Sequence, residues 1–140
     1  MNLKLVKDDK QSKTSQIFDN LNKEQIKAVS HIEGPVLVVA GAGSGKTRVL
    51  THRIANMIDK GINPRSILAL TFTNKAADEM KTRIMNLVDS ALAQKIWAGT
   101  FHSIFARVLR FEAESIGYTS DFSIYDADDS LSCIKNVWLI

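Results

Sequence analysis

A chain of 140 residues is long enough for one domain, and its 45% apolar content is enough to form a core. The net charge of +3 permits nucleic acid as a partner without arguing for it, and a single cysteine excludes an internal disulfide framework and fits a reducing compartment. No apolar run approaches the ~18 residues of a membrane span and the N-terminus has no apolar signal core, so we expect a cytoplasmic protein with no membrane partner.

Short apolar runs rich in β-branched residues alternate with stretches that place apolar residues at helical spacing. Residues 1–20 precede this pattern; they are polar, show little periodicity and are expected to form a loosely ordered arm. The predicted elements, in chain order, are a helix from Asn22 that stops at Gly34-Pro35, a strand at 36–39, a helix at 46–60, a strand at 66–72, a helix at 74–88 that Asn74 caps, a strand at 95–99, a helix from about 100 to 117, a strand at 122–125 and a helix from 126 onwards.

This alternation indicates an α/β fold, in which right-handed βαβ crossovers put helices on both faces of a parallel sheet. Ligands of such sheets bind at the carboxyl ends of the strands. Three segments leave predicted strand ends, at 40–47, 71–75 and 100–103, so all three should meet at one rim. The apolar helical positions expected to pack inward are Ile26, Val29, Ile32, Val49, Leu50, Ile54, Met57, Ile58, Ala77, Met80, Ile84, Leu87, Ile104, Phe105, Val108 and Phe111, and Cys133 is expected to be a buried thiol.

The most specific run is Ala40-Gly41-Ala42-Gly43-Ser44-Gly45-Lys46-Thr47, with Ala at its first position where the pattern usually has Gly. It stands between a predicted strand and a predicted helix, as a phosphate-binding P-loop requires. Its glycines let backbone N–H groups turn inward around anionic oxygens at the positive end of a helix dipole. Lys46 can then reach β- and γ-phosphates, and the Thr47 hydroxyl can hold Mg²⁺. The alternative, a Gly/Ser-rich linker, does not fit this context.

Four segments together resemble the start of the first motor domain of UvrD/Rep-type superfamily 1 DNA helicases. Residues 21–29 resemble the Q motif and 40–50 resemble motif I. The run Leu-Thr-Phe-Thr-Asn-Lys-Ala-Ala at 70–77 resembles motif Ia, and Gly-Thr-Phe-His at 99–102 resembles the next DNA-contacting motif. The match extends over about residues 21–137. It implies a RecA-like P-loop NTPase domain that uses ATP and Mg²⁺.

The resemblance also implies two sets of binding residues. The nucleotide set, in which Lys46 and Thr47 are catalytic and Thr47 is the Mg²⁺ ligand, comprises Gln25, Ala40, Gly41, Ala42, Gly43, Ser44, Gly45, Lys46, Thr47 and Arg48. The DNA set comprises Phe72, Thr73, Asn74, Thr100, Phe101 and His102. A planar amide such as that of Gln25 suits the edges of adenine, and an aromatic ring at a strand end can stack on an unpaired base.

Simpler roles remain open for several of these side chains. Gln25 could only complete a capping box at the start of its helix, and Asn74 could be a plain helix N-cap. His102 could be a buried, hydrogen-bonded histidine, and Arg48 could be a surface arginine.

A hydrolytic P-loop motor also needs an apolar strand that ends in Asp-Glu, to hold Mg²⁺ and polarise the attacking water. Residues 122–126 are the nearest candidate, and we reject them because no Glu follows Asp126, which stands where a helix cap is expected. The chain stops in the apolar, uncapped run 137–140. We therefore expect residues 21–120 to be the N-terminal part of a RecA-like motor domain, 121–140 to be the truncated start of an inserted helical subdomain, and the isolated chain to be inactive.

The resemblance implies a parent helicase that couples ATP hydrolysis to 3′–5′ movement along single-stranded DNA and to unwinding at duplex junctions, in DNA repair or replication. One alternative is a fragment of an AddA/RecB-type helicase–nuclease, and another is a catalytically inactive nucleotide-binding module. The motif Ia run and the lack of a lid-like Arg-rich segment disfavour a small-molecule or nucleotide kinase built on the same P-loop.

Overall fold

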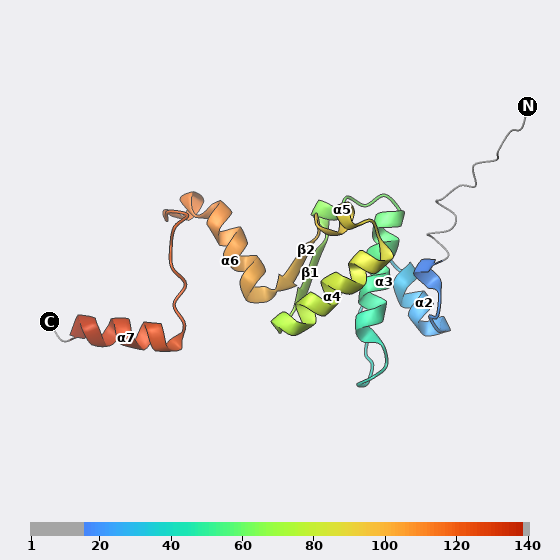
Figure 1. Ribbon diagram of the computed structural model, residues 1–140, viewed down its shortest axis with the longest axis horizontal. Helices are drawn as coiled ribbons and strands as arrows, with labels where there is room; N and C mark the ends of the chain where they lie inside the picture. The colour runs from blue at the N-terminus through green and yellow to red at the C-terminus, as the bar shows by residue number, and fades with distance from the viewer. Residues whose placement is uncertain (1–15, 139–140) are drawn as a thin grey trace, which may run out of the picture. The chain divides into compact units, whose positions relative to one another are not determined.

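A computed structural model describes residues 16–138 as an α/β chain, coloured from N- to C-terminus in Figure 1. Two compact units divide it, the first ending at Ile104 and the second beginning at Phe105. The elements are α2 (Lys23–Ser30), α3 (Lys46–Asp59), the 3₁₀ turn η1 (Pro64–Ser66), β1 (Leu68–Thr71), α4 (Asn74–Leu87), α5 (Ser90–Ala93), β2 (Trp97–Thr100), α6 (Phe101–Glu112), the 3₁₀ turn η2 (Glu114–Ile116) and α7 (Ala127–Trp138). Within the described residues, no helix is both long and apolar enough to cross a bilayer.

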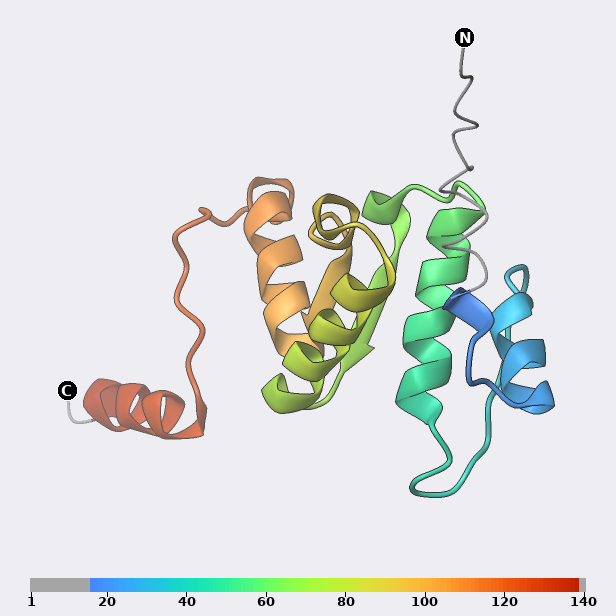
Figure 2. The same cartoon turned by 45° about the vertical axis from the view of Figure 1, so that its right-hand side comes forward.

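In the first unit, α3 lies between α2 and α4, as Figures 1 and 2 show. The apolar cluster that joins α3 and α4 to the strands consists of Ile54, Ile67, Ala69, Met80, Ile84 and Ile96. A second cluster joins α3 to α2 and to the helical residues 16–18, and consists of Ile17, Val29, Val49 and Ala55. The buried Asn56 amide adds a hydrogen bond to the Val29 carbonyl (3.0 Å). Most of the expected inward positions of α2, α3 and α4 are therefore confirmed, whereas Ile26 and Leu50 are exposed, at 36% and 37%.

Of the polar arm expected at residues 1–20, the structure describes residues 16–20. Residues 1–15 lie outside the described residues, whereas Ile17 is buried in the second cluster. The Ile17 carbonyl also lies 2.6 Å from Nδ1 of His52 on α3. The end of the arm is thus packed against the helix that follows the glycine-rich loop.

The sheet consists of β1 and β2, which pair in parallel. Leu68 pairs with Trp97, and the register continues to Thr71 opposite Thr100. The chain between the strands passes through α4, which packs on both of them, so the pair is a βαβ unit. An α/β structure with parallel strands is as predicted. Both strands are shorter than their predicted ranges, 66–72 and 95–99, and α5 was not predicted.

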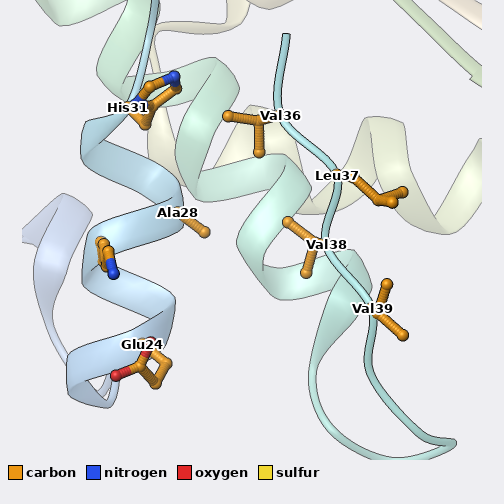
Figure 3. A pocket seen from close by; sticks show the side chains of 8 residues that line it. Glu24, Ala28, His31, Val36, Leu37, Val38 and Val39 are labelled. Carbon is orange, nitrogen blue, oxygen red and sulfur yellow. The ribbon is translucent and has the colours of Figure 1, made fainter.

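The strand predicted at 36–39 is wrong. The segment is extended, but it has no ladder partner among residues 16–138. Its side chains alternate, with Val36 and Val38 at 40% and 41% exposure and Leu37 and Val39 at 87% and 86%. The valines at 36 and 38 point toward α2 and α3 in Figure 3, and Leu37 and Val39 point away. The residues have the alternation of a strand, but a strand is defined by its hydrogen-bonded neighbour.

The second unit departs further from the sequence predictions. Residues 122–125 form no strand, and Cys133, predicted to be buried, is exposed. Although Ile104 is buried as expected, the following residues of α6 are open, with Phe105 47% and Phe111 69% exposed. Their helical periodicity correctly predicts a helix. Burial also needs another apolar surface to pack against, and the large apolar residues described in this unit are mostly exposed; Ala113 is its buried hydrophobic residue among those described.

Candidate nucleotide and nucleic-acid site

The glycine-rich loop leads directly into α3, whose N-cap is Gly45. Gly43 and Gly45 both adopt left-handed backbone conformations, with φ of 75° and 84°. Only glycine adopts this conformation without strain, which explains two of the three glycines of the run. The Ser44 hydroxyl closes the turn by donating to the Gly41 carbonyl (2.7 Å). The loop and the carboxyl ends of β1 and β2 lie toward the same end of the first unit (Figures 1 and 2).

Lys46 is the first residue of α3, and its side chain bends back over the loop. Its Nζ donates to the carbonyls of Ala40 (2.7 Å) and Gly41 (2.6 Å). The ammonium is therefore held at the loop by acceptors that an anionic oxygen could replace. Thr47, the next residue, is exposed at the helix start. These residues fit the requirements of a phosphate site with a Mg²⁺ ligand, namely a left-handed turn, a helix N-terminus, a lysine and an accessible hydroxyl.

Gln25 links α2 to this loop. Its Oε1 accepts the Asn22 backbone N–H (3.0 Å), and its own N–H donates to the Asn22 side chain (2.9 Å), which is the capping box predicted from the sequence. The other end of the amide donates from Nε2 to the carbonyl of Ser44 (3.0 Å). A cavity of about 200 Å³ lies beside this contact, and its lining includes Gln25, Ser44, Lys46, the polar residues Asn22 and Glu24, and neighbouring apolar side chains. Sequence reasoning paired Gln25 with adenine and did not foresee its contact with the loop.

Arg48 contacts the segment that precedes α2. Its guanidinium donates to the backbone carbonyl of Asn20 (3.3 Å), so it ties the N-terminal segment to α3.

A larger cavity, of about 430 Å³, lies between α2 and the extended segment 36–39, and Figure 3 shows its lining. Its walls carry Glu24, Lys27 and His31 beside five apolar side chains, so they share no single charge that would identify a ligand.

Phe72 and Phe101 occupy equivalent places in the two strand-end segments. Each follows the last residue of its strand, Thr71 or Thr100, and these two threonines are paired in the ladder. Since adjacent strands lie about 4.8 Å apart, the parallel register carries both rings to one edge. Their centroids are 5.6 Å apart at an interplanar angle of 41°, and Phe72 is 90% exposed. The pair forms an aromatic rim, defined here as Phe72 and Phe101, that is open to solvent.

Two polar residues beside the aromatic rim, Thr73 and Thr100, are engaged in capping. Thr73, not Asn74, is the N-cap of α4, because its hydroxyl accepts the Ala76 N–H (3.2 Å), and the prediction that Asn74 caps is wrong. Thr100 is 6% exposed and exchanges hydrogen bonds with Ser103, including Ser103 N–H to Thr100 Oγ1 (3.2 Å). His102 is exposed, so it is not a buried histidine.

The acidic candidate at the end of the chain behaves as a cap. The Asp126 carboxylate accepts the Asp129 backbone N–H (2.8 Å), and the Asp129 carboxylate accepts the Asp126 N–H in return (3.3 Å). This reciprocal pair starts α7, as predicted. Among residues 16–138, no group of three or more His, Cys, Asp or Glu side chains is arranged to hold a metal ion.

Comparison with known proteins agrees with the four motifs. Residues 21–139 match the UvrD/REP helicase N-terminal domain, and the chain therefore belongs to the UvrD/REP helicase family. It is 56% identical over 122 residues to the ATP-dependent DNA helicase PcrA of Staphylococcus epidermidis, and 52% identical over 122 residues to the protein of that name in Staphylococcus aureus. Each match covers 86% of this chain and 17% of the relative. The chain thus spans about a sixth of the length of these relatives.

Proposed function

We propose that this chain carries the ATP-phosphate site and part of the single-stranded-DNA surface of a PcrA-like helicase, within the N-terminal part of a RecA-like motor domain. The observation that carries the proposal is the placement of two different surfaces at one end of the first unit. One is a glycine loop with Lys46 at a helix start, and the other is the aromatic rim. The relatives are named ATP-dependent DNA helicases, and these names support the same two ligands, ATP and DNA.

Different loop residues would have different roles in nucleotide binding. The N–H groups around Gly43 and Gly45 receive the β- and γ-phosphate oxygens, and Lys46 exchanges its two carbonyl acceptors for phosphate. Thr47 would hold Mg²⁺, which neutralises charge that develops on the phosphates. Ala40, Gly41, Ala42 and Ser44 shape the loop. Arg48 supports the site through the Asn20 carbonyl in the structure and is proposed as a nucleotide contact on release of that bond.

The rim would bind single-stranded DNA by stacking. An exposed ring accepts any base on its face, and such a contact is worth about 1–3 kcal/mol per base with little sequence preference. Asn74 and His102, both exposed, would contact phosphate or sugar oxygens, whereas Thr73 and Thr100 would contribute through the backbone. The resemblance extends the proposal to 3′–5′ movement and unwinding at duplex junctions by the whole helicase, in DNA repair or replication.

Two matched pairs of variants test whether the surfaces are separate. Lys46→Ala should weaken binding of Mg–ATP to the 140-residue chain at least tenfold, because one charge-assisted contact is worth about 1.5–3 kcal/mol. Phe72→Ala should weaken binding of an oligo-dT strand about 5-fold or more at low salt, because base stacking is lost. Neither variant should affect the other ligand. The controls are Lys60→Ala, an exposed lysine at the far end of α3, and Phe111→Ala, another exposed phenylalanine.

The outcomes separate the two halves of the proposal. Unchanged ATP affinity in Lys46→Ala contradicts the phosphate site. DNA affinity that falls equally in Phe72→Ala and Phe111→Ala contradicts the rim, because general loss of an exposed ring would then explain the effect.

A further inference from the structure

We infer that Gln25 is a positioning residue for the phosphate loop, acting through the carbonyl of Ser44. The inference rests on the proposed phosphate site and adds a role that does not involve the base of the nucleotide. Gln25 and Ser44 are 19 residues apart in sequence, yet Nε2 of Gln25 lies 3.0 Å from the Ser44 oxygen. Gln25 is also half-buried, in contrast to the exposed residues Gly43 and Ser44 of the loop.

The Gln25 amide is itself held firmly. Its Oε1 accepts the backbone N–H of Asn22 (3.0 Å), so the capping box fixes the side chain to the first turn of α2. The helix α2 is itself anchored, because its residue Val29 is fully buried against α3. A donor presented from a fixed helix can orient a flexible loop, whereas a donor on a free side chain would follow it.

Orientation of the Ser44 carbonyl matters for the phosphate site. In a trans peptide, the C=O of one residue and the N–H of the next point in opposite directions. A hydrogen bond that holds the Ser44 oxygen toward Gln25 therefore directs the Gly45 N–H to the opposite side, away from α2. This N–H belongs to the left-handed turn at Gly45 (φ 84°) and is one of the donors from which a phosphate nest is built.

The glycine at 45 fits this contact as well as the turn. A Cβ built at Gly45 would lie 2.8 Å from Nε2 of Gln25, closer than nonbonded atoms approach. At Gly43, where φ is 75°, a Cβ would meet nothing within 4 Å. The amide thus packs directly on the Gly45 Cα. The Gln25 side chain therefore makes two contacts with the loop, a hydrogen bond to Ser44 and van der Waals packing on Gly45.

A ligand without a base separates this role from adenine recognition. Binding of Mg–tripolyphosphate to the 140-residue chain would be measured by titration calorimetry for four proteins: the unchanged chain, Gln25→Ala, Asn22→Ala and Lys46→Ala. Gln25→Ala should weaken binding about three- to tenfold, the usual range for one lost hydrogen bond. Asn22→Ala removes the other half of the capping box but leaves the Ser44 contact, so its affinity should stay within about twofold.

Amide hydrogen exchange without phosphate gives a second readout. Exchange at residues 43–46 should be faster in Gln25→Ala than in the unchanged chain and should be unaffected by Asn22→Ala. Gln25→Glu is the alternative variant if Gln25→Ala does not fold. It keeps an oxygen for the Asn22 N–H but offers no donor to Ser44, so the same increase in exchange is expected.

Each failure has a distinct meaning. Tripolyphosphate binding that Lys46→Ala leaves intact, or no binding by the unchanged chain, overturns the proposed phosphate site and this inference with it. Binding that falls in Lys46→Ala but not in Gln25→Ala keeps the phosphate site and overturns the positioning role. Equal losses in Gln25→Ala and Asn22→Ala also overturn it, because the capping of α2 alone would account for them.

Discussion

Replacement of Gly45 by alanine tests how the glycine loop is held. Gly45 has a φ of 84°, and the left-handed conformation costs a residue with a Cβ about 1–2 kcal/mol. The new methyl would also collide with Nε2 of Gln25, at 2.8 Å, and break its hydrogen bond to Ser44. A net hydrogen bond is worth about 0.5–1.5 kcal/mol. Gly45→Ala should therefore lower the free energy of unfolding by about 1.5–3.5 kcal/mol.

Gly61→Ala is the matched control. Gly61 follows α3 with a φ of 87°, and a Cβ there would meet nothing within 4 Å. The decrease in the free energy of unfolding of Gly61→Ala should therefore reflect only the cost of the left-handed conformation. Urea unfolding would be followed by Trp97 fluorescence in a Trp138→Phe background, so that the signal comes from the first unit. A double-mutant cycle of Gly45→Ala with Gln25→Ala should then show coupling of about 0.5–1.5 kcal/mol. Equal losses at 45 and 61 together with additive effects in the cycle would refute the reasoning.

Three further outcomes are expected. Met80→Ala should lower the free energy of unfolding by about 2–5 kcal/mol, because Met80 is fully buried. Met85 lies on the same helix but is 43% exposed, so Met85→Ala should lower it far less. Equal losses of stability in urea unfolding would contradict the assigned core. Asp126→Ala should weaken α7 by about 1 kcal/mol as a lost cap and leave Mg–ATP affinity unchanged, and a fall in that affinity would revive Asp126 as the acidic motif. The purified 140-residue chain should hydrolyse ATP at no more than a trace rate in a phosphate-release assay, and robust, DNA-stimulated turnover would show that the sequence contains the missing acidic group.

The sequence predicts those parts of the structure that depend on local chemistry. Glycines at 43 and 45 need no distant partner to form a left-handed turn, and Asn22 with Gln25 forms its capping box within one helical turn. The same holds for α3 and α4, whose buried residues follow the helical period.

The failures concern features that need a partner. Residues 36–39 have the composition of a strand, but pairing requires a neighbouring backbone that residues 16–138 do not supply. The outward exposure of Phe105 and Phe111 has the same cause, since periodicity defines an apolar face without providing what covers it. The contact of Gln25 with Ser44 joins two motifs that sequence reasoning treated separately, and no local pattern encodes it.

The choice of N-cap at the strand ends bears on what the rim can bind. Thr73 and Thr100 each follow or end a strand, and each uses its hydroxyl as an acceptor for a backbone N–H at the start of the next helix. These hydroxyls are thereby engaged, whereas the residues beside them, Phe72 and Phe101, present their rings to solvent. The capping thus leaves the ring faces, together with the exposed Asn74 and His102, as the accessible groups at this edge. Ring faces do not distinguish one base from another, which is the property that the proposed contact with single-stranded DNA requires.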